Sequence, residues 1–103
     1  MKYDIVITNK CKKDIQKASK QGKNIDLLFK IIDQLSEGEK LDEKYKDHQL
    51  TGKYKGKREC HIEPDFLLIY EIIKREVVLY LVRVGSHSDL FDWIFNVINE
   101  SLV

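Results

Sequence analysis

The fold is decided by residues 45–70, YKDHQLTGKYKGKRECHIEPDFLLIY, where a lysine-rich polar segment gives way to strand-like sequence. In residues 58–63 polar and apolar side chains alternate, as they do in a strand with one buried face. A Pro-Asp turn then leads into residues 66–73, which are almost entirely apolar. We therefore expect an antiparallel hairpin here, with His61 on the polar face of its first strand.

The flanking segments extend this hairpin into a small sheet. Residues 74–76 predict a second turn and residues 77–84 a third strand, so the middle of the chain forms an antiparallel meander. Residues 3–8 are rich in β-branched side chains and predict a separate first strand. Residues 39–57 have no regular period and predict an irregular connection of unusual length.

Three helices are predicted where apolar residues recur at helical spacing. The first covers residues 10–21, and the second begins after Asn24, a favourable cap, and ends at Gly38. The third covers residues 88–103 with Ser88 as its cap, and is apolar except for a narrow polar stripe.

These elements predict an α+β fold: an N-terminal strand, two helices, a meander that brings the sheet to about four strands in total, and a C-terminal helix. A chain of 103 residues is long enough for one core and too short for a second domain. We therefore expect a single domain over residues 1–103, in which residues 92–103 form a helical extension.

Charge is distributed unevenly along the chain. The net charge is only +1, yet the first 85 residues hold all eighteen cations against fourteen anions. The segment between Glu43 and His61 is locally basic, which suits a polyanion but is also typical of a solvated lysine-rich loop. Two distant cysteines, the lack of a signal-like N-terminus and the lack of a long apolar run predict reduced thiols, no membrane association and a cytoplasmic location.

Three histidines, His48, His61 and His87, all lie in the second half of the chain. Taken singly, each fits an ordinary surface or half-buried residue. As a set they matter more, because imidazole both takes and gives protons near neutral pH.

Three motifs carry a resemblance to a known family: YKDHQL at residues 45–50, HIEPDFLLIY at 61–70 and RVGSHSDLF at 83–91. They resemble the YafQ branch of the RelE superfamily of bacterial type II toxins, in the same order along residues 3–91. The resemblance implies a RelE-like fold and a toxin that enters the ribosomal A site and cuts messenger RNA as a ribosome-dependent endoribonuclease. It also implies a cognate antitoxin that holds the toxin inactive.

Carried over position by position, the functional residues that the family implies are His48, His61, Asp65, Arg83, His87 and Phe91. Phe66 stands where YafQ toxins have tryptophan; it keeps an apolar ring but lacks the indole donor. The residues expected to contact RNA are Lys53, Lys55, Lys57, Arg58, Phe66 and Phe91.

Cleaving RNA without a metal requires a base for the 2′-hydroxyl, an acid for the departing 5′-oxygen and a cation for the phosphate. We expect His87 to be the acid and His48 or His61 the base. Arg83 would clamp the phosphate, and Asp65 would orient a histidine.

Two other functions fit parts of the pattern. Three histidines and an aspartate are also zinc ligands, but the sequence has no closely spaced ligand pair, so we expect no metal or other cofactor. The second is a RelE/ParE-like toxin that acts only by binding, or a corepressor that acts with its antitoxin. The histidine set argues against a pure binding module, which has no need of it.

Overall fold

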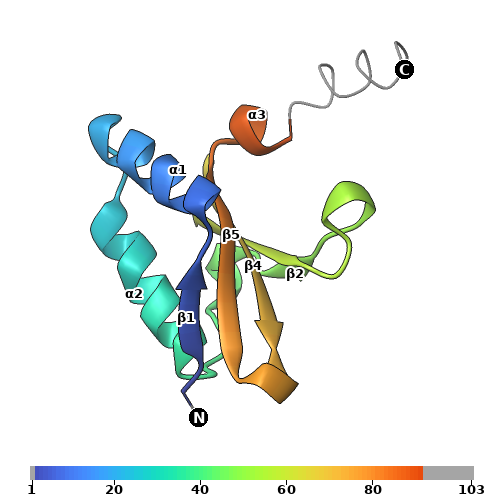
Figure 1. Cartoon of the computed structure of the whole chain (residues 1–103). Coiled ribbons are helices and arrows are strands. Elements are labelled where there is room, and N and C mark those ends of the chain that lie inside the picture. Colours follow the sequence, from blue (N-terminus) through green and yellow to red (C-terminus); the bar gives the residue numbers. More distant parts are fainter. Residues whose placement is uncertain (1, 92–103) are drawn as a thin grey trace.

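Five strands form one mixed sheet in the order β1-β5-β4-β3-β2 (Figure 1). The computed structural model describes residues 2–91. The strands are β1 (Asp4–Ile7), β2 (His48–Gln49), β3 (Arg58–Glu63), β4 (Phe66–Ile73) and β5 (Val78–Gly85). The helices are α1 (Asn9–Lys20), α2 (Ile25–Ser36) and α3 (His87–Leu90), and the 3-10 turns are η1 (Glu43–Tyr45), η2 (Gly52–Tyr54) and η3 (Lys74–Glu76).

The α+β class and the β3-β4-β5 meander are confirmed, and two features of the sheet differ from the prediction. There are five strands instead of about four, because part of the irregular connection pairs with β3 as the two-residue strand β2. The first strand is parallel to its neighbour β5. A strand of two residues is too short to show alternation, and the choice of a parallel partner depends on contacts far apart in sequence.

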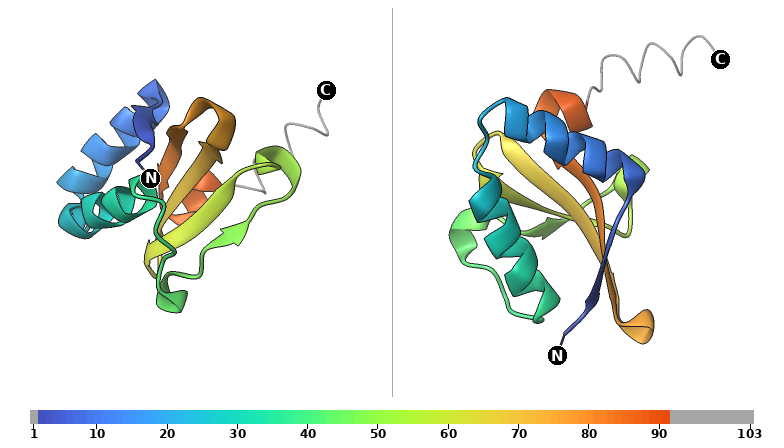
Figure 2. Two further views of the ribbon diagram at one scale, coloured as in Figure 1. Left: turned by 90° about the horizontal axis from the view of Figure 1, so that it is seen from below. Right: turned by 60° about the vertical axis from the view of Figure 1, so that its left-hand side comes forward.

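Helices α1 and α2 lie together on one side of the strands (Figure 2). Thr8 caps α1 and Asn24 caps α2, each by accepting a backbone N–H with its side chain. Their apolar stripes cover a core formed with the sheet. Its largest fully buried members include Leu28, Phe66 and Tyr70.

The two cysteines, Cys11 and Cys60, are free and lie in this helix-covered core. Burial raises the pKa of the Cys11 thiol to about 12, and burial also raises the pKa of Cys60. Both thiols are therefore protonated at neutral pH and unsuited to act as nucleophiles.

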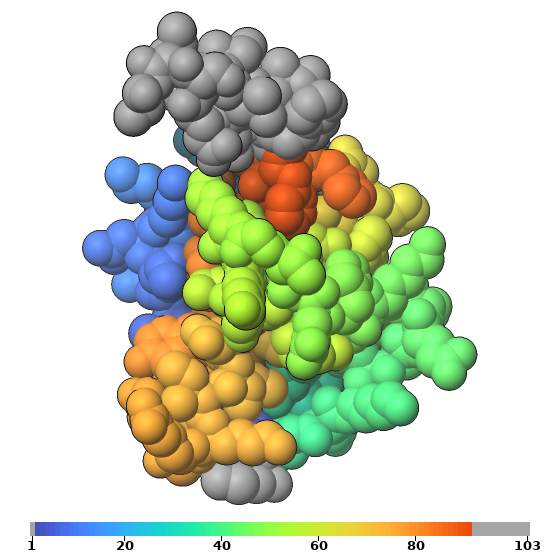
Figure 3. Space-filling view, turned by 90° about the vertical axis from the view of Figure 1, so that its right-hand side faces the viewer, coloured from blue at the N-terminus to red at the C-terminus, as the bar shows by residue number. Residues whose placement is uncertain are grey.

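The opposite face of the sheet carries a smaller apolar cluster, Tyr54, Leu67, Ile69 and Leu90. Leu67 and Ile69 come from β4, whereas Tyr54 comes from η2 and Leu90 from α3. Figure 3 looks onto this side, where the η2 segment (lime) and α3 (red) lie next to each other. This cluster attaches η2 and α3 to the face of the sheet that α1 and α2 do not cover.

The C-terminal prediction is tested only in part. The cap of α3 is Ser86, two residues before the expected Ser88, and Ser86 forms a reciprocal capping box with Asp89. The helix ends at Leu90 with Phe91 as its C-cap, so the prediction of one continuous helix through Phe91 is wrong. The predicted extension over residues 92–103 lies outside the described residues. None of the helices within residues 2–91 has the length and apolar character that a membrane span requires.

Thr8 joins the first strand, the first helix and the last strand. Its hydroxyl accepts the Cys11 N–H (3.0 Å) and donates to the Val82 carbonyl (2.9 Å). The second bond satisfies the Val82 carbonyl, which lies at the edge of β5 just beyond the point where β1 ends.

We predict that Thr8→Val, which keeps the shape and removes both bonds, lowers the free energy of unfolding by about 1–2 kcal/mol. Urea denaturation measures the loss. Thr8→Ser retains the hydroxyl and is the matched control. Equal stabilities for the valine and serine variants would show that the hydroxyl does not contribute.

Candidate active site

Four residues form one row across β2, β3, β4 and β5. His48 is paired with Glu59, Glu59 with Ile69, and Ile69 with Arg83. Directly opposed residues of antiparallel strands project to the same face. Because Ile69 belongs to the cluster away from α1 and α2, this row lies on the face that the two long helices do not cover.

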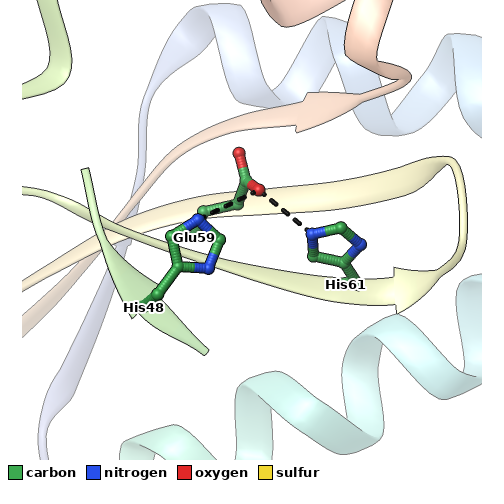
Figure 4. A group of neighbouring side chains, drawn as sticks. All are labelled: His48, Glu59 and His61. Carbon is green, nitrogen blue, oxygen red and sulfur yellow. Dashed lines mark ion pairs between the residues drawn. The ribbon is translucent and has the colours of Figure 1, made fainter. Parts of the chain in front are cut away.

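Glu59 is the centre of the site and is only 4% exposed. Its Oε1 lies 3.2 Å from Nε2 of His61 and 3.6 Å from Nε2 of His48 (Figure 4). A buried carboxylate is costly unless it is paired, and here two imidazoles are its partners. Glu59 therefore holds the two rings in place from within the sheet.

His48 is held by a second contact. Its Nδ1 lies 2.6 Å from the carbonyl oxygen of Lys46. Because a carbonyl only accepts, Nδ1 must carry the proton, and Nε2 is the atom turned toward Glu59. Lys46 has a φ of 51°, a left-handed conformation that is uncommon for a residue with a side chain. His48 therefore lies in the short strand β2, directly after an ordered turn. It does not lie in the irregular loop that we expected.

His87 and Asp65 form a second pair beside the first. The Asp65 carboxylate accepts the backbone N–H of His87 at 2.8 Å and lies 2.8 Å from its Nδ1. The backbone N–H, and then the imidazole, lower the pKa of Asp65, which keeps this carboxylate ionised. The ring centroid of His87 is 5.6 Å from that of His61, so the three histidines form one continuous group.

Arg83 is committed to a carboxylate that the sequence analysis did not identify. Its Nε and Nη2 donate to Asp14 of α1 at 2.7 and 3.0 Å, and the Val84 N–H donates to the same side chain at 3.1 Å. These bonds raise the pKa of Arg83, whose side chain is 15% exposed. The Tyr54 side chain is a further hydrogen-bond partner of Arg83, so the guanidinium is held between Asp14 and Tyr54.

The structure contradicts one of the predicted RNA contacts. Phe66 is 1% exposed and belongs to the core under α1 and α2, so its ring cannot stack on a base. Phe91 is half-buried, and its ring meets the edge of Tyr54 with centroids 5.6 Å apart. Of the two predicted aromatic contacts, Phe66 and Phe91, it is therefore Phe91 that borders the open face.

The predicted RNA-binding cations differ in their surroundings. Lys53 and Lys55 are exposed on and after η2. Lys57 lies 4.0 Å from Glu71, and Arg58 is bonded to Asp47 at 3.2 Å. The first two are accordingly the cations best placed to meet a phosphate backbone.

Sequence reasoning missed Glu59 and Asp14. Glu59 could have been found, because it lies two residues from His61 and so shares a face of the same strand. Asp14 gives a weaker signal: it is the only acidic residue in the lysine-rich α1. Nothing local connects it with Arg83, which is 69 residues away.

Comparison with known proteins agrees with this architecture. Residues 3–92 match a family described as the bacterial toxin of type II toxin–antitoxin systems, YafQ. The mRNA interferase toxin YafQ of Escherichia coli (strain K12) is 36% identical over 89 residues, covering 85% of this chain and 95% of that protein.

Two solved structures extend the comparison. A metal-bound toxin from Helicobacter pylori is 46% identical and has a TM-score of 0.81, covering 86% of this chain and 99% of that one. The E. coli DinJ-YafQ toxin–antitoxin complex matches with 35% identity and a TM-score of 0.79, covering 88% and 99%.

The fold and the histidine-carboxylate face therefore define a toxin of the type II toxin–antitoxin class. Within that class, the chain belongs to the YafQ family.

We predict that Asp14→Ala lowers the free energy of unfolding by about 2–4 kcal/mol, because the guanidinium of Arg83 and the Val84 N–H lose their acceptor. Chemical denaturation measures the change, and Asp14→Asn, which keeps one acceptor oxygen, should lose less. Adding Arg83→Leu to Asp14→Ala should restore part of the loss. A double variant no more stable than Asp14→Ala would contradict the pairing.

Proposed function

We propose that this chain is an endoribonuclease that cuts translated messenger RNA on the ribosome by general acid–base chemistry. The observation that supports this most directly is the pair of carboxylate-held imidazoles, His61 with Glu59 and His87 with Asp65, whose ring centroids are 5.6 Å apart. Two imidazoles at this separation can act on the two sides of a single phosphate. The YafQ relative from E. coli is named an mRNA interferase.

In the proposed reaction His61 is the base. Glu59 accepts the Nε2 proton, which leaves Nδ1 to take the proton of the 2′-hydroxyl. The 2′-oxygen attacks phosphorus, and the bond from phosphorus to the 5′-oxygen breaks. His48, whose Nε2 lies 3.6 Å from Oε1 of Glu59, is the alternative base.

His87 is the proposed acid. Its Nδ1 proton is held by Asp65, and Nε2 gives a proton to the departing 5′-oxygen. The products are a 2′,3′-cyclic phosphate and a 5′-hydroxyl. Arg83, held in place by Asp14 and Tyr54, supplies the positive charge that stabilises the negative charge on the phosphate.

The exposure of the site supports the dependence on the ribosome. The side chains of His48 and His87 are 49% and 53% exposed, so the protein alone does not enclose a substrate. An open site needs its RNA held in position by something else, since positioning accounts for much of the rate in such reactions. A message in the ribosomal A site is held in that way.

We also propose a cognate antitoxin and a cytoplasmic location. The structural relative bound to DinJ is a toxin–antitoxin complex of the same family. The substrate, translated messenger RNA, is found in the cytoplasm.

The first test is cleavage of a translated message by the purified chain, mapped at the 5′ ends of the fragments. His61→Ala and His87→Ala should each reduce the cleavage rate by about 10² to 10⁴-fold, because each removes one acid–base step. Tyr80→Ala, a change on β5 outside the site, is the control, and all three should still bind the antitoxin. If the chain inhibits growth without cutting the message, and both histidine variants inhibit growth to the same extent as the wild type, the result would instead favour a binding toxin.

The same cluster also has the composition of a metal site. His48, Glu59 and His61 each present one ligand atom, all within 4.8 Å of one another, and imidazole and carboxylate hold Zn²⁺ and Cu²⁺ in many proteins. We propose that cleavage itself uses no metal, because the side chains supply both acid and base. An ion held by these residues would take Glu59 away from His61 and so inhibit.

We predict that cleavage persists with a chelator selective for transition metals, in a buffer that keeps Mg²⁺ for the ribosome. Added Zn²⁺ should lower the rate, and less so in His48→Ala, relative to that variant's own metal-free rate, because one ligand is missing. Initial rates on the same message measure both effects. Activity lost with the chelator and restored by Zn²⁺ would show that the reaction needs the metal.

A further inference from the structure

A groove of about 370 Å³ opens beside His61, and apart from His61 none of its lining residues takes part in the proposed acid–base chemistry. Its walls come from three elements: Leu27 of α2, the η1 segment with Tyr45, and the end of β3 with Pro64. His61 belongs both to the lining of the groove and to the group of histidines and carboxylates described above. The groove is therefore continuous with the proposed site.

The apolar residues that line the groove are Leu27, Tyr45, Ile62 and Pro64. Leu27 and Tyr45 pack against the main core, and Ile62 in the floor is buried. The backbone N–H of Asn24 donates to Glu63 at 3.0 Å, which ties the start of α2 to the end of β3. The two sides of the groove are thus held together by a bond between elements far apart in sequence.

The lining of the groove carries two cations, Lys44 and Lys46, and one anion, Glu63, whose carboxylate accepts the Asn24 N–H. Both lysines are exposed, and Nζ of Lys44 lies 5.2 Å from the centroid of the Tyr45 ring. An aromatic ring, apolar walls and nearby cations are the elements by which proteins hold a base of single-stranded RNA with its phosphate.

We propose that this groove binds the base of the nucleotide on the 5′ side of the cut, and that Tyr45 determines sequence preference at that position. The inference rests on the proposed ribonuclease function, in which His61 removes the proton of the 2′-hydroxyl. That hydroxyl belongs to the nucleotide 5′ of the scissile phosphate. Its base therefore lies next to His61, where the groove begins.

The test compares Tyr45 variants by mapping and counting the 5′ ends of fragments from one translated message. Tyr45→Phe keeps the ring, and should keep cleavage near the wild-type rate. Tyr45→Ala removes it, and should lower cleavage at the preferred sites by about fivefold or more, with a weaker preference for the nucleotide 5′ of the cut. Tyr80→Ala, a half-buried tyrosine on β5, should retain the wild-type pattern.

Tyr45 also packs against the core, so a second variant separates binding from folding. Tyr45→Leu preserves apolar packing without an aromatic ring, and should change the pattern as Tyr45→Ala does, at a melting temperature near that of the wild type. If both variants fold and cut at wild-type sites and rates, the groove does not hold a base.

The same variants exclude a protein ligand. Antitoxin affinity should be unchanged in Tyr45→Leu; a fall in that affinity with an unchanged cleavage pattern would assign the groove to the antitoxin and overturn the inference. If the wild type cuts the message and the Tyr45 variants cut it in the same way, the proposed role of the groove is wrong and the proposed ribonuclease function stands. A wild type that cuts no message overturns the proposed function itself.

Discussion

The register of the sheet is the constraint on which the rest of this structure depends. Pairing of His48 with Glu59, and of Ile69 with both Glu59 and Arg83, brings residues from four strands into one row. A slip of one residue in any pair would turn these side chains to the other face. The helix-covered core resists such a slip, because it would expose apolar residues that are now buried.

Carboxylates inside this frame position the cationic and imidazole groups. Glu59 holds His48 and His61, and Asp14 holds Arg83 at the edge of β5 beyond the end of β1. Within residues 2–91, no buried side-chain nitrogen or oxygen lacks a hydrogen-bond partner. Each carboxylate is therefore satisfied before any ligand arrives, which preorganises the site and reduces the reorganisation needed for chemistry.

The two faces of the sheet consequently have separate tasks. The face under α1 and α2 supplies most of the buried apolar surface, whereas the other face carries His48 and His61 on β2 and β3, beside His87 at the start of α3. A shallow, exposed arrangement of this kind suits a toxin whose substrate is presented by a larger assembly. The groove at Tyr45 would give it contact with the sequence of the message as well as with its backbone.

The sequence by itself determined the first two helices, the meander and the residue types of the site, because periodicity, caps and turns are local properties. The bounds of β3 and β4, and the cap at Asn24, follow from those signals. Only the tertiary structure decided that β1 pairs with β5, that Phe66 is buried, and that Asp14 and Glu59 belong with the site. These facts depend on contacts between distant segments, where packing and charge pairing override local pattern.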